Sequence, residues 1–372
     1  MKKIKINTKH FDFPIPNIIN NIILSKYNFD RIDIFDNVPC VYVTPKISKL
    51  DRNFIQKCLN KKFVFLNENI FSKIEDGTIS PLEKENILNE IQELSKLGFS
   101  ISMPLANFPT VFGENEQISK DLALFLYKTK LDIKFLTFPC EYFAVPVWAE
   151  NYRNTKIYSC QNVTIHPRML EGLSEKEIVK TIQSYTPSSA STYQSKYYIN
   201  LKSNRLAQGL EKIIYCCPNC ENLVSLYSEF SCVKCKNCGS AFELSPDGKI
   251  LFTQKFNNFD QVENFQYSAL TKKDFDINMI IEYDKITQFF SIKYKKTTKF
   301  NVILQIYPEK LIIKNQFTNQ NSEIFYEDIE NVNYLFDNTL EVIPKNANQF
   351  YFHGNNNENL LIIKDLVKIN KN

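Results

Sequence analysis

The residues best placed to do chemistry are six cysteines between positions 216 and 238, out of ten in the chain. They include the pairs CPNC at 217–220 and CKNC at 235–238, which fourteen residues separate. Pro218 and Gly239 can bend each pair into a tight turn around one ion. Four thiolates at about 2.3 Å from the metal are the preferred arrangement of structural zinc, and they leave no open position for catalysis. The spacing therefore predicts a structural Zn²⁺ site with the ligands Cys217, Cys220, Cys235 and Cys238.

Two more cysteines leave the ligand set open. Cys232-x-x-Cys235 also has the spacing of a metal-binding pair, and Cys216 directly precedes the first pair. We favour the pairs 217–220 and 235–238 because only that choice gives two separate turns around one ion. A pair of disulfides is the alternative, but disulfides are rare where the compartment keeps thiols reduced.

The chain has the composition of a globular protein with more than one hydrophobic core. It is 372 residues long, with 44% hydrophobic and 13% aromatic residues, which suits two or three domains. No apolar run reaches the roughly 18 residues of a membrane span, and the N-terminal segment lacks the cleavage site of a signal peptide. We therefore expect a cytoplasmic protein, at most peripheral on the inner face of the membrane.

The charge pattern argues against nucleic acid as a partner. The formal charge of +4 arises from 45 basic and 41 acidic residues, whereas nucleic-acid proteins usually carry a denser basic stripe. The loop ENLVSLYSEFS between the cysteine pairs has no lysine or arginine, so it offers no cation to phosphates. A zinc ribbon that binds nucleic acid remains an alternative, beside a ribbon that braces two domains.

Strand-like and helix-like segments alternate from residue 33 to about residue 170. Such alternation is typical of an α/β layer with a mainly parallel sheet. The helix at 81–97 has the clearest signals, because Pro81 opens it, Gly98 ends it and apolar residues recur every three or four positions. The sequence predicts strands at 36–45, 61–67, 99–105 and 132–140, and helices near 51–60, 81–97 and 118–130.

The last third of the chain consists of short aromatic and β-branched runs, followed by one helical segment at 359–369. This pattern predicts a small, mostly antiparallel β domain with a C-terminal helix, similar to a pleckstrin-homology (PH) domain. Four lysines near an expected hairpin turn could meet anionic lipid, at about 1 kcal/mol per basic residue. In the alternative they form a solvated turn that protects a sheet edge from aggregation. These residues are Lys293, Lys295, Lys296 and Lys299.

Residues 172–214 connect the two regions. They are predicted to form polar helices on either side of the Ser-rich stretch PSSASTYQS. We therefore expect three domains: an α/β domain at 1–204, a helix plus zinc ribbon at 205–250, and a PH-like β domain at 251–372.

The stretch RLAQGLEKIIYCCPNC, followed by KCKNCGSAFELSPDGKI, resembles the region after the catalytic domain in a bacterial subgroup of lysophospholipid (1-acylglycerol-3-phosphate) acyltransferases. In that subgroup a helix leads into a cysteine ribbon, and Arg205, Leu210 and Glu211 keep part of its signature. Upstream, three segments follow the order of the family's later blocks. They lie at 98–114, 131–149 and 165–178. The resemblance spans about 33–250 and implies an acyltransferase-like α/β domain.

The family's first motif, His-x-x-x-x-Asp after a strand, corresponds here to the segment that runs from Lys46 to Asp51. In the family the histidine takes a proton from the acceptor's glycerol hydroxyl as it attacks an acyl thioester, and the aspartate orients the histidine. Lys46 stands in the place of the histidine. Lysine has an ordinary pKa of about 10.4 and is a poor base near neutral pH, so Lys46 would serve only if strongly desolvated.

The family's second motif, Phe-Pro-Glu-Gly with an arginine two residues later, holds the acceptor's phosphate. In the favoured register, Leu105 stands in the glutamate position and Phe108 in the arginine position. An alternative register over NFPT at 107–110 places Thr110 in the glutamate position, so the charge is missing in both registers. Losing a positioned base costs roughly 10²- to 10⁴-fold in rate, and losing a phosphate-binding arginine removes charge-assisted bonds as well. Both losses point to a retired site. The corresponding substrate-binding positions, after Met103, are Pro104, Leu105, Ala106 and Phe108.

None of the three histidines replaces the missing base in the sequence. His166 and His353 each precede a glutamate at a suitable spacing. The first, however, lies beyond the sheet segments, and the second lies in the C-terminal domain. His10 has no such partner nearby, and we interpret all three as incidental.

The favoured hypothesis is an acyltransferase-family protein that has lost its standard chemistry and acts as a lipid- or partner-binding module. The alternative is an active enzyme that uses Lys46 as an unusual base. It would move an acyl chain from acyl-CoA or acyl carrier protein to a lysophospholipid in phospholipid synthesis.

Overall fold

The computed structural model divides into two compact units. Unit 1 comprises residues 1–110, 114–142 and 154–198, and unit 2 comprises residues 111–113, 143–153 and 199–372. The cysteine block and the C-terminal strands fall in the same unit. The structure describes residues 10–12, 28–29, 38–44, 55, 62–105, 110–114, 117–138, 140–151, 153–157, 160–187, 189–194, 196–272, 281–290, 298–318, 320–335, 338–354 and 358–371.

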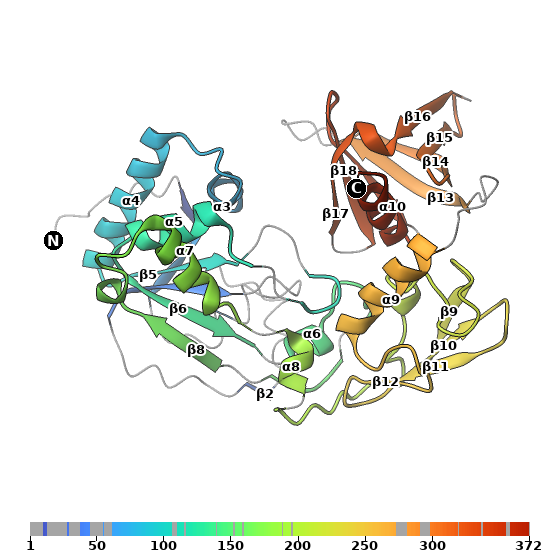
Figure 1. The fold of residues 1–372 in the computed structure, drawn as a ribbon, viewed down its shortest axis with the longest axis horizontal. Helices are drawn as coiled ribbons and strands as arrows, with labels where there is room; N and C mark the ends of the chain where they lie inside the picture. The colour runs from blue at the N-terminus through green and yellow to red at the C-terminus, as the bar shows by residue number, and fades with distance from the viewer. Residues whose placement is uncertain are drawn as a thin grey trace. The chain divides into compact units, whose positions relative to one another are not determined.

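Unit 1 is built on a six-stranded sheet in the order β1-β4-β5-β3-β6-β8 (Figure 1). The inner strands β4, β5, β3 and β6 run parallel, while β1 and β8 are antiparallel edge strands. The sheet is thus mainly parallel, as the alternating segments predict. Its strands are β1 (Phe11–Asp12), β3 (Cys40–Thr44), β4 (Phe63–Leu66), β5 (Ser100–Pro104), β6 (Asp132–Thr137) and β8 (Cys160–Ile165).

Four helices supply the aliphatic side chains that cover one face of this sheet (Figure 1). The predicted helix at 81–97 is confirmed as α4, and the side chain of Ser80 caps it by accepting from Glu83 N. The sequence analysis missed α3, whereas the helix expected near 51–60 lies outside the described residues except for Ile55. The four helices are α3 (Glu68–Glu75), α4 (Pro81–Lys96), α5 (Lys120–Lys128) and α7 (Glu175–Ser184).

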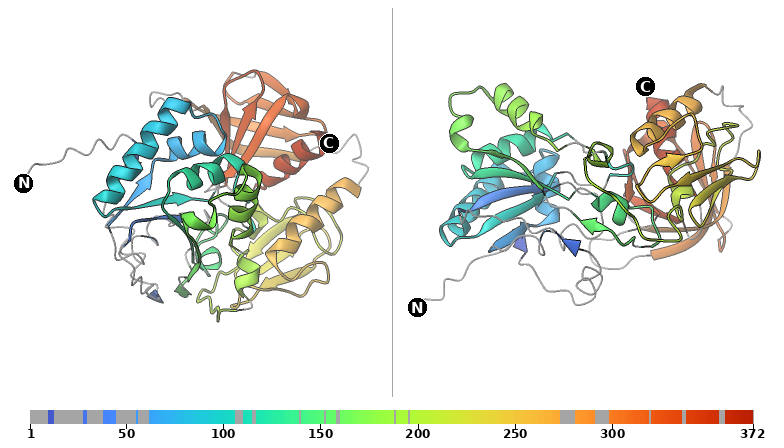
Figure 2. Two further views of the ribbon diagram at one scale, coloured as in Figure 1. Left: turned by 60° about the vertical axis from the view of Figure 1, so that its left-hand side comes forward. Right: turned by 90° about the horizontal axis from the view of Figure 1, so that it is seen from below.

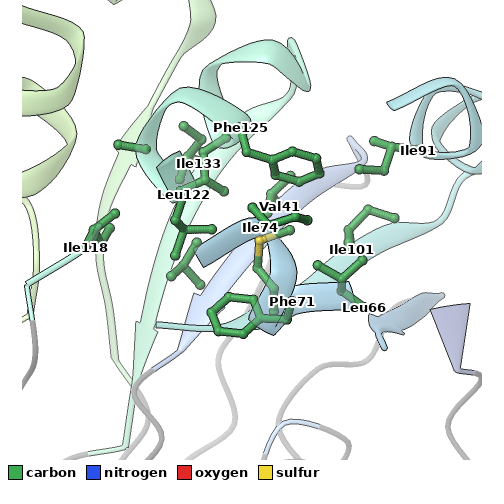
Figure 3. Packing of buried hydrophobic residues seen from close by; sticks show 14 of the residues in the cluster. Val41, Leu66, Phe71, Ile74, Ile91, Ile101, Ile118, Leu122, Phe125 and Ile133 are labelled. Carbon is green, nitrogen blue, oxygen red and sulfur yellow. The ribbon is translucent and has the colours of Figure 1, made fainter. Parts of the chain in front are cut away.

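The two faces of the sheet differ in chemistry. Val41 and Ile101, which are Cα partners on β3 and β5, belong to the apolar core under the helices (Figure 3). Each such fully buried side chain contributes roughly 1.5–3 kcal/mol to stability. The opposite face carries Ser102, Tyr42 and Lys134 in one row across three strands, and all three are buried.

Unit 2 contains two antiparallel sheets. The smaller, in the order β12-β11-β10-β9, carries the cysteine block. The larger has the order β16-β15-β14-β13-β19-β18-β17 and forms a half-barrel, against which α10 packs beside β17 (Figures 1 and 2). The strand series with one closing helix is therefore confirmed, but the sequence analysis missed α9 (Phe259–Lys272).

The elements of the smaller sheet are β9 (Leu226–Glu229), β10 (Cys232–Cys235), β11 (Ala241–Leu244) and β12 (Ile250–Leu251). Those of the half-barrel are β13 (Ile281–Phe290), β14 (Thr298–Ile306), β15 (Lys310–Asn315), β16 (Asn321–Phe325), β17 (Ile329–Leu335), β18 (Thr339–Pro344), β19 (Phe350–Gly354) and α10 (Leu361–Lys371). No helix within the described ranges is both long enough and apolar enough to cross a membrane.

The segment 205–214, expected to be helical, instead forms turns and a short 3-10 helix, η2 (Leu210–Lys212). Gly209 has a φ of +96°, and a Cβ at this position would collide with the carbonyl oxygen of Trp148. The helical prediction was wrong because this left-handed residue interrupts the segment. Leu206 and Leu210 recur at helical spacing and both are buried, but Gly209 between them does not have helical backbone angles.

Residues 143–153 pack against α9 within unit 2. The ring of Trp148 stacks on Phe259 with their centroids 5.9 Å apart. The guanidinium of Arg153 lies 4.4 Å from the Trp148 ring and donates to the carbonyl oxygens of Phe143 and Leu206. Because the side chain of Arg153 is almost fully buried, these bonds offset the cost of removing its charge from water.

A second buried polar group lies where the chain enters the cysteine block. The hydroxyl of Tyr215 donates to Asp365 Oδ2 at 2.7 Å. Gln266 of α9 accepts from Tyr215 N at 3.2 Å. Burial raises the pKa of Asp365 from its ordinary value of 3.8 to about 6, while the hydrogen bond from Tyr215 opposes that rise. The charged groups that also act on Asp365 are Glu263, Lys364 and Lys368.

This raised pKa predicts a pH-dependent stability. A carboxyl group that binds its proton more tightly when folded adds stability below its unfolded pKa and loses that contribution as the pH rises through the folded pKa. We expect Asp365→Asn, which keeps an acceptor for Tyr215, to become more stable than the wild type between about pH 4 and pH 7, by up to roughly 3 kcal/mol.

Urea unfolding across this pH range measures the effect. The exposed Asp328 provides the control variant Asp328→Asn. The four cysteines are the same in every protein compared, so their own pH dependence cancels in the difference. A constant difference between Asp365→Asn and the wild type at all pH values would contradict the prediction.

Candidate functional site: a four-cysteine centre and the edge of the parallel sheet

The structure brings four cysteines of the ribbon together. The sulfur atoms of this group all lie within 4.8 Å of one another. The shortest pairs are Cys217 with Cys238 and Cys220 with Cys235, each at 3.8 Å between sulfurs. The four are the predicted ligands, and a set of four converging thiols fits an ion of tetrahedral preference such as zinc.

The backbone repeats itself in the two cysteine pairs. Cys217 N donates to Asn222 O at 3.0 Å, and Cys235 N donates to Ser240 O at 2.9 Å. Each turn also ends in a left-handed residue, since φ is +55° at Glu221 and +72° at Gly239. The prediction of two separate turns is therefore confirmed, and the two have the same backbone pattern, although only one of them has the glycine that this conformation favours.

The thiols of the group differ in their surroundings. Burial raises the pKa of Cys217 to about 11. The hydroxyl of Ser240, 3.0 Å from the sulfur of Cys238, lowers the pKa of that thiol to about 5. A metal ion needs the deprotonated form of each ligand.

The two remaining cysteines of the block lie apart from the four. Among the described residues, the group of metal-binding geometry contains neither Cys216 nor Cys232. The sulfur of Cys216 instead donates to backbone oxygens, including that of Glu221 at 3.6 Å. Cys232 begins β10 and faces Glu229 and Glu243 as Cα partners on the flanking strands.

A second candidate site lies at the carboxyl edge of the parallel sheet. Strands β3 and β5 are neighbours, and their last residues Thr44 and Pro104 are Cα partners. Leu105 N donates to Thr44 O at 2.6 Å. The chain segments that carry the two expected motifs therefore begin side by side, although they are about 60 residues apart in sequence.

Strand order makes this edge a favoured place for a ligand. From β3 the chain moves to β4 in one direction along the sheet, and from β5 it moves to β6 in the other. In open α/β sheets, ligands favour the carboxyl edge at a place where the connections of neighbouring strands run in opposite directions. The motif residues Lys46, Asp51, Ala106 and Phe108 lie outside the described residues.

The described motif positions are apolar. Pro104 ends β5, and the side chain of Leu105 is only 2% exposed and belongs to the apolar core of unit 1. Thr110, the alternative position of the missing glutamate, is buried as well. Neither position presents a charged group to a phosphate.

His10, which has no partner nearby in the sequence, has one in the structure. Its Nδ1 lies 2.9 Å from Glu90 Oε1 of α4, in a cavity of about 670 Å³ on the outer side of that helix. His10 precedes β1, which is three strands from β3, or roughly 14 Å at the usual strand spacing. A general base must reach its proton over about 3 Å, so His10 does not serve the β3–β5 edge.

The other two histidines have structural partners. His166 Nδ1 lies 2.9 Å from Oδ1 of Asp132, which begins β6 at the amino edge of the sheet, opposite to the motif edge. His353 Nδ1 lies 3.0 Å from Thr339 Oγ1 in unit 2. Neither replaces the missing base.

Comparisons with known proteins give only distant likenesses. No protein-family model and no curated protein matches the chain. Among solved structures, the chain is similar to the 1-acyl-sn-glycerophosphate (LPA) acyltransferase PlsC from Thermotoga maritima, with 15% identity over 45% of this chain and 73% of the other, at a TM-score of 0.34.

Two further structures cover shorter parts of the chain. The N-terminal PH domain of human ARAP2 matches with 15% identity over 25% of this chain and 76% of its own, at a TM-score of 0.19. The C-terminal domain of an unknown protein from Leishmania infantum matches with 15% identity over 26% of this chain and 84% of its own, at a TM-score of 0.16. TM-scores this low do not establish a common fold.

The ligand set is testable by single substitutions. We expect Cys220→Ser to lose bound metal, because it removes one of four converging sulfurs, with retention at least about tenfold weaker than in the wild type. Cys216→Ser and Cys232→Ser are the matched controls and should keep the metal. Elemental analysis and titration with a chromophoric chelator measure this, and equal loss in a control variant would refute the ligand set.

Proposed function

We propose that this chain is an acyltransferase-family protein that has lost the standard chemistry of that family and binds a lipid or a partner at the edge of its parallel sheet. The ribbon acts as a structural brace and holds one Zn²⁺ through Cys217, Cys220, Cys235 and Cys238. The ligand class at the sheet edge is a lysophospholipid, with acyl-CoA or acyl carrier protein as the donor in the ancestral reaction.

One observation carries this proposal: the adjacent ends of β3 and β5. A reaction between an acyl thioester and a hydroxyl needs a base and a phosphate clamp close together, because positioning supplies much of the rate. The contact between Leu105 N and Thr44 O brings the starts of both motif segments within one hydrogen bond of each other. The motif order in the sequence and the strand order in the sheet thus support the same site.

The chemistry of that edge supports the loss of function. A guanidinium that binds phosphate must face the ligand, a carboxylate beside it must stay hydrated or paired, and burying either one unpaired is costly. Leu105, in the place of the family's glutamate, instead packs into the apolar core. Lys46 replaces the base, and Phe108 replaces the arginine.

The assay that tests the proposal is transfer of a labelled acyl chain from acyl-CoA or acyl carrier protein to lysophosphatidic acid. We expect no turnover in the wild type. Lys46→His should not restore turnover, because the phosphate clamp is missing as well. Lys49→His is the matched control, since it adds the same imidazole to the same segment without the motif spacing.

Binding is measured separately from turnover. We expect lysophosphatidic acid to bind the full chain in isothermal titration, with no acyl transfer. Turnover in the wild type that disappears in Asp51→Ala would refute the proposal that the acyl-transfer chemistry has been lost. Lys46 would then be the base. Absence of both binding and turnover would refute the sheet edge as a lipid site.

The half-barrel adds a membrane-facing surface to the proposal. Lys299 is exposed at the start of β14, and Phe317 is 77% exposed in the turn that follows β15. Because Val302 and Asn315 are Cα partners, that turn extends toward the Lys299 end of the sheet. A protruding aromatic side chain and Lys299 at the same end of the sheet fit an anionic lipid surface. The other predicted lysines, Lys293, Lys295 and Lys296, lie outside the described residues.

Vesicle sedimentation tests this surface. Phe317→Ser should weaken binding to anionic vesicles by about tenfold or more, since inserting such a ring contributes roughly 1.5–3 kcal/mol. Phe252→Ser is the control, because Phe252 is 78% exposed on the ribbon. Equal binding by Phe317→Ser and the wild type would favour the alternative, in which the lysines only protect a sheet edge.

A further inference from the structure

The two cysteine turns share a residue besides their cysteines. Each has asparagine at its third position, in CPNC and CKNC. Asn219 Nδ2 donates to the sulfur of Cys238 at 3.6 Å, and Asn237 Nδ2 donates to the sulfur of Cys220 at 3.6 Å. Each amide therefore reaches across the centre to the last cysteine of the other turn. The two amide–sulfur contacts therefore correspond to each other in the same way as the backbone hydrogen bonds of the two turns do.

Neutral side chains supply donors to the remaining sulfurs. Ser225 Oγ lies 3.1 Å from the sulfur of Cys235, and Ser240 Oγ lies 3.6 Å from that of Cys217. A divalent ion with four thiolates keeps a charge of about −2, which hydrogen-bond donors stabilise. With the two asparagines, every sulfur of the group has a polar side chain as neighbour.

We propose that Asn219 and Asn237 are positioning residues for the metal centre. Their amide N–H groups hold the two turns in register and stabilise the thiolate charge, and both effects slow the loss of the metal. The inference rests on the metal assignment proposed above, but not on any role in acyl transfer. Its rival is a purely conformational role, in which asparagine only favours the bend of each turn through its side-chain oxygen.

The two roles respond differently to aspartate and alanine. Asn→Asp keeps the size and the side-chain oxygen but removes the donor, whereas Asn→Ala removes both. A role as donor predicts that Asn219→Asp and Asn237→Asp lose metal faster, as their alanine variants do. A conformational role predicts faster loss in the alanine variants alone.

The experiment measures the rate at which the reduced, full-length protein passes Zn²⁺ to a chromophoric chelator at constant pH. We expect each aspartate variant to release metal about 10- to 100-fold faster than the wild type. The two single variants should agree with each other, and the double variant should be faster still. The Co²⁺-loaded proteins should keep the absorption of four-thiolate coordination, which shows that the ligands are unchanged.

Asn222→Asp is the matched control. Asn222 is exposed in the same loop, so the variant adds an equal charge near the centre without removing a donor to sulfur. Release from Asn219→Asp and Asn237→Asp no faster than from Asn222→Asp would overturn the inference. A wild-type chain that takes up neither Zn²⁺ nor Co²⁺ would overturn it as well. Failure of the acyl-transfer and lipid-binding experiments would leave it standing.

Discussion

The fold of unit 2 depends on one short segment, the residues between Gly209 and Cys217. Its backbone has little ordinary secondary structure, so other elements must satisfy its buried polar groups. Asn359 Nδ2 donates to Glu211 O at 2.8 Å, and Gln266 bonds to the segment through both ends of its amide. A buried backbone group without a partner costs about 1–3 kcal/mol. The segment therefore fixes α9 and the turn before α10 relative to the ribbon.

The four-cysteine group lies at the end of this segment. When Cys217 and the second turn bind one ion, coordination anchors the Cys217 end of the segment. The close approach of Gly209 to Trp148 anchors the other end. The binding of a structural metal supplies folding free energy, because the ligands converge only in the folded chain. We infer that losing the ion would loosen the contacts of α9 and α10 as well as the ribbon, since both meet the same nine residues.

Local signals in the sequence predicted local structure well. The helix at 81–97 carries its own cap, proline and glycine, and the two cysteine pairs carry their own spacing. The helical prediction at 205–214 was wrong because the left-handed Gly209 interrupts a segment whose apolar residues have helical spacing. The bond between His10 and Glu90 joins residues 80 positions apart, so no local pattern reveals it. The asparagines of the two turns were visible as C-x-N-C, but only the structure shows that each reaches the opposite cysteine.

The four-cysteine group has its full set of ligands, whereas the described motif positions at the edge of the parallel sheet are apolar. This difference between the two candidate sites has a physical reason. A four-sulfur centre holds its ion much more weakly once one ligand is removed, so its ligand set tolerates little change. On the function proposed above, the sheet edge has lost its charged groups without harm to the fold, because an apolar side chain such as that of Leu105 extends the core beneath the edge. On the same proposal one substitution would not restore the site, because a glutamate at position 105 would place an unpaired carboxylate in that core.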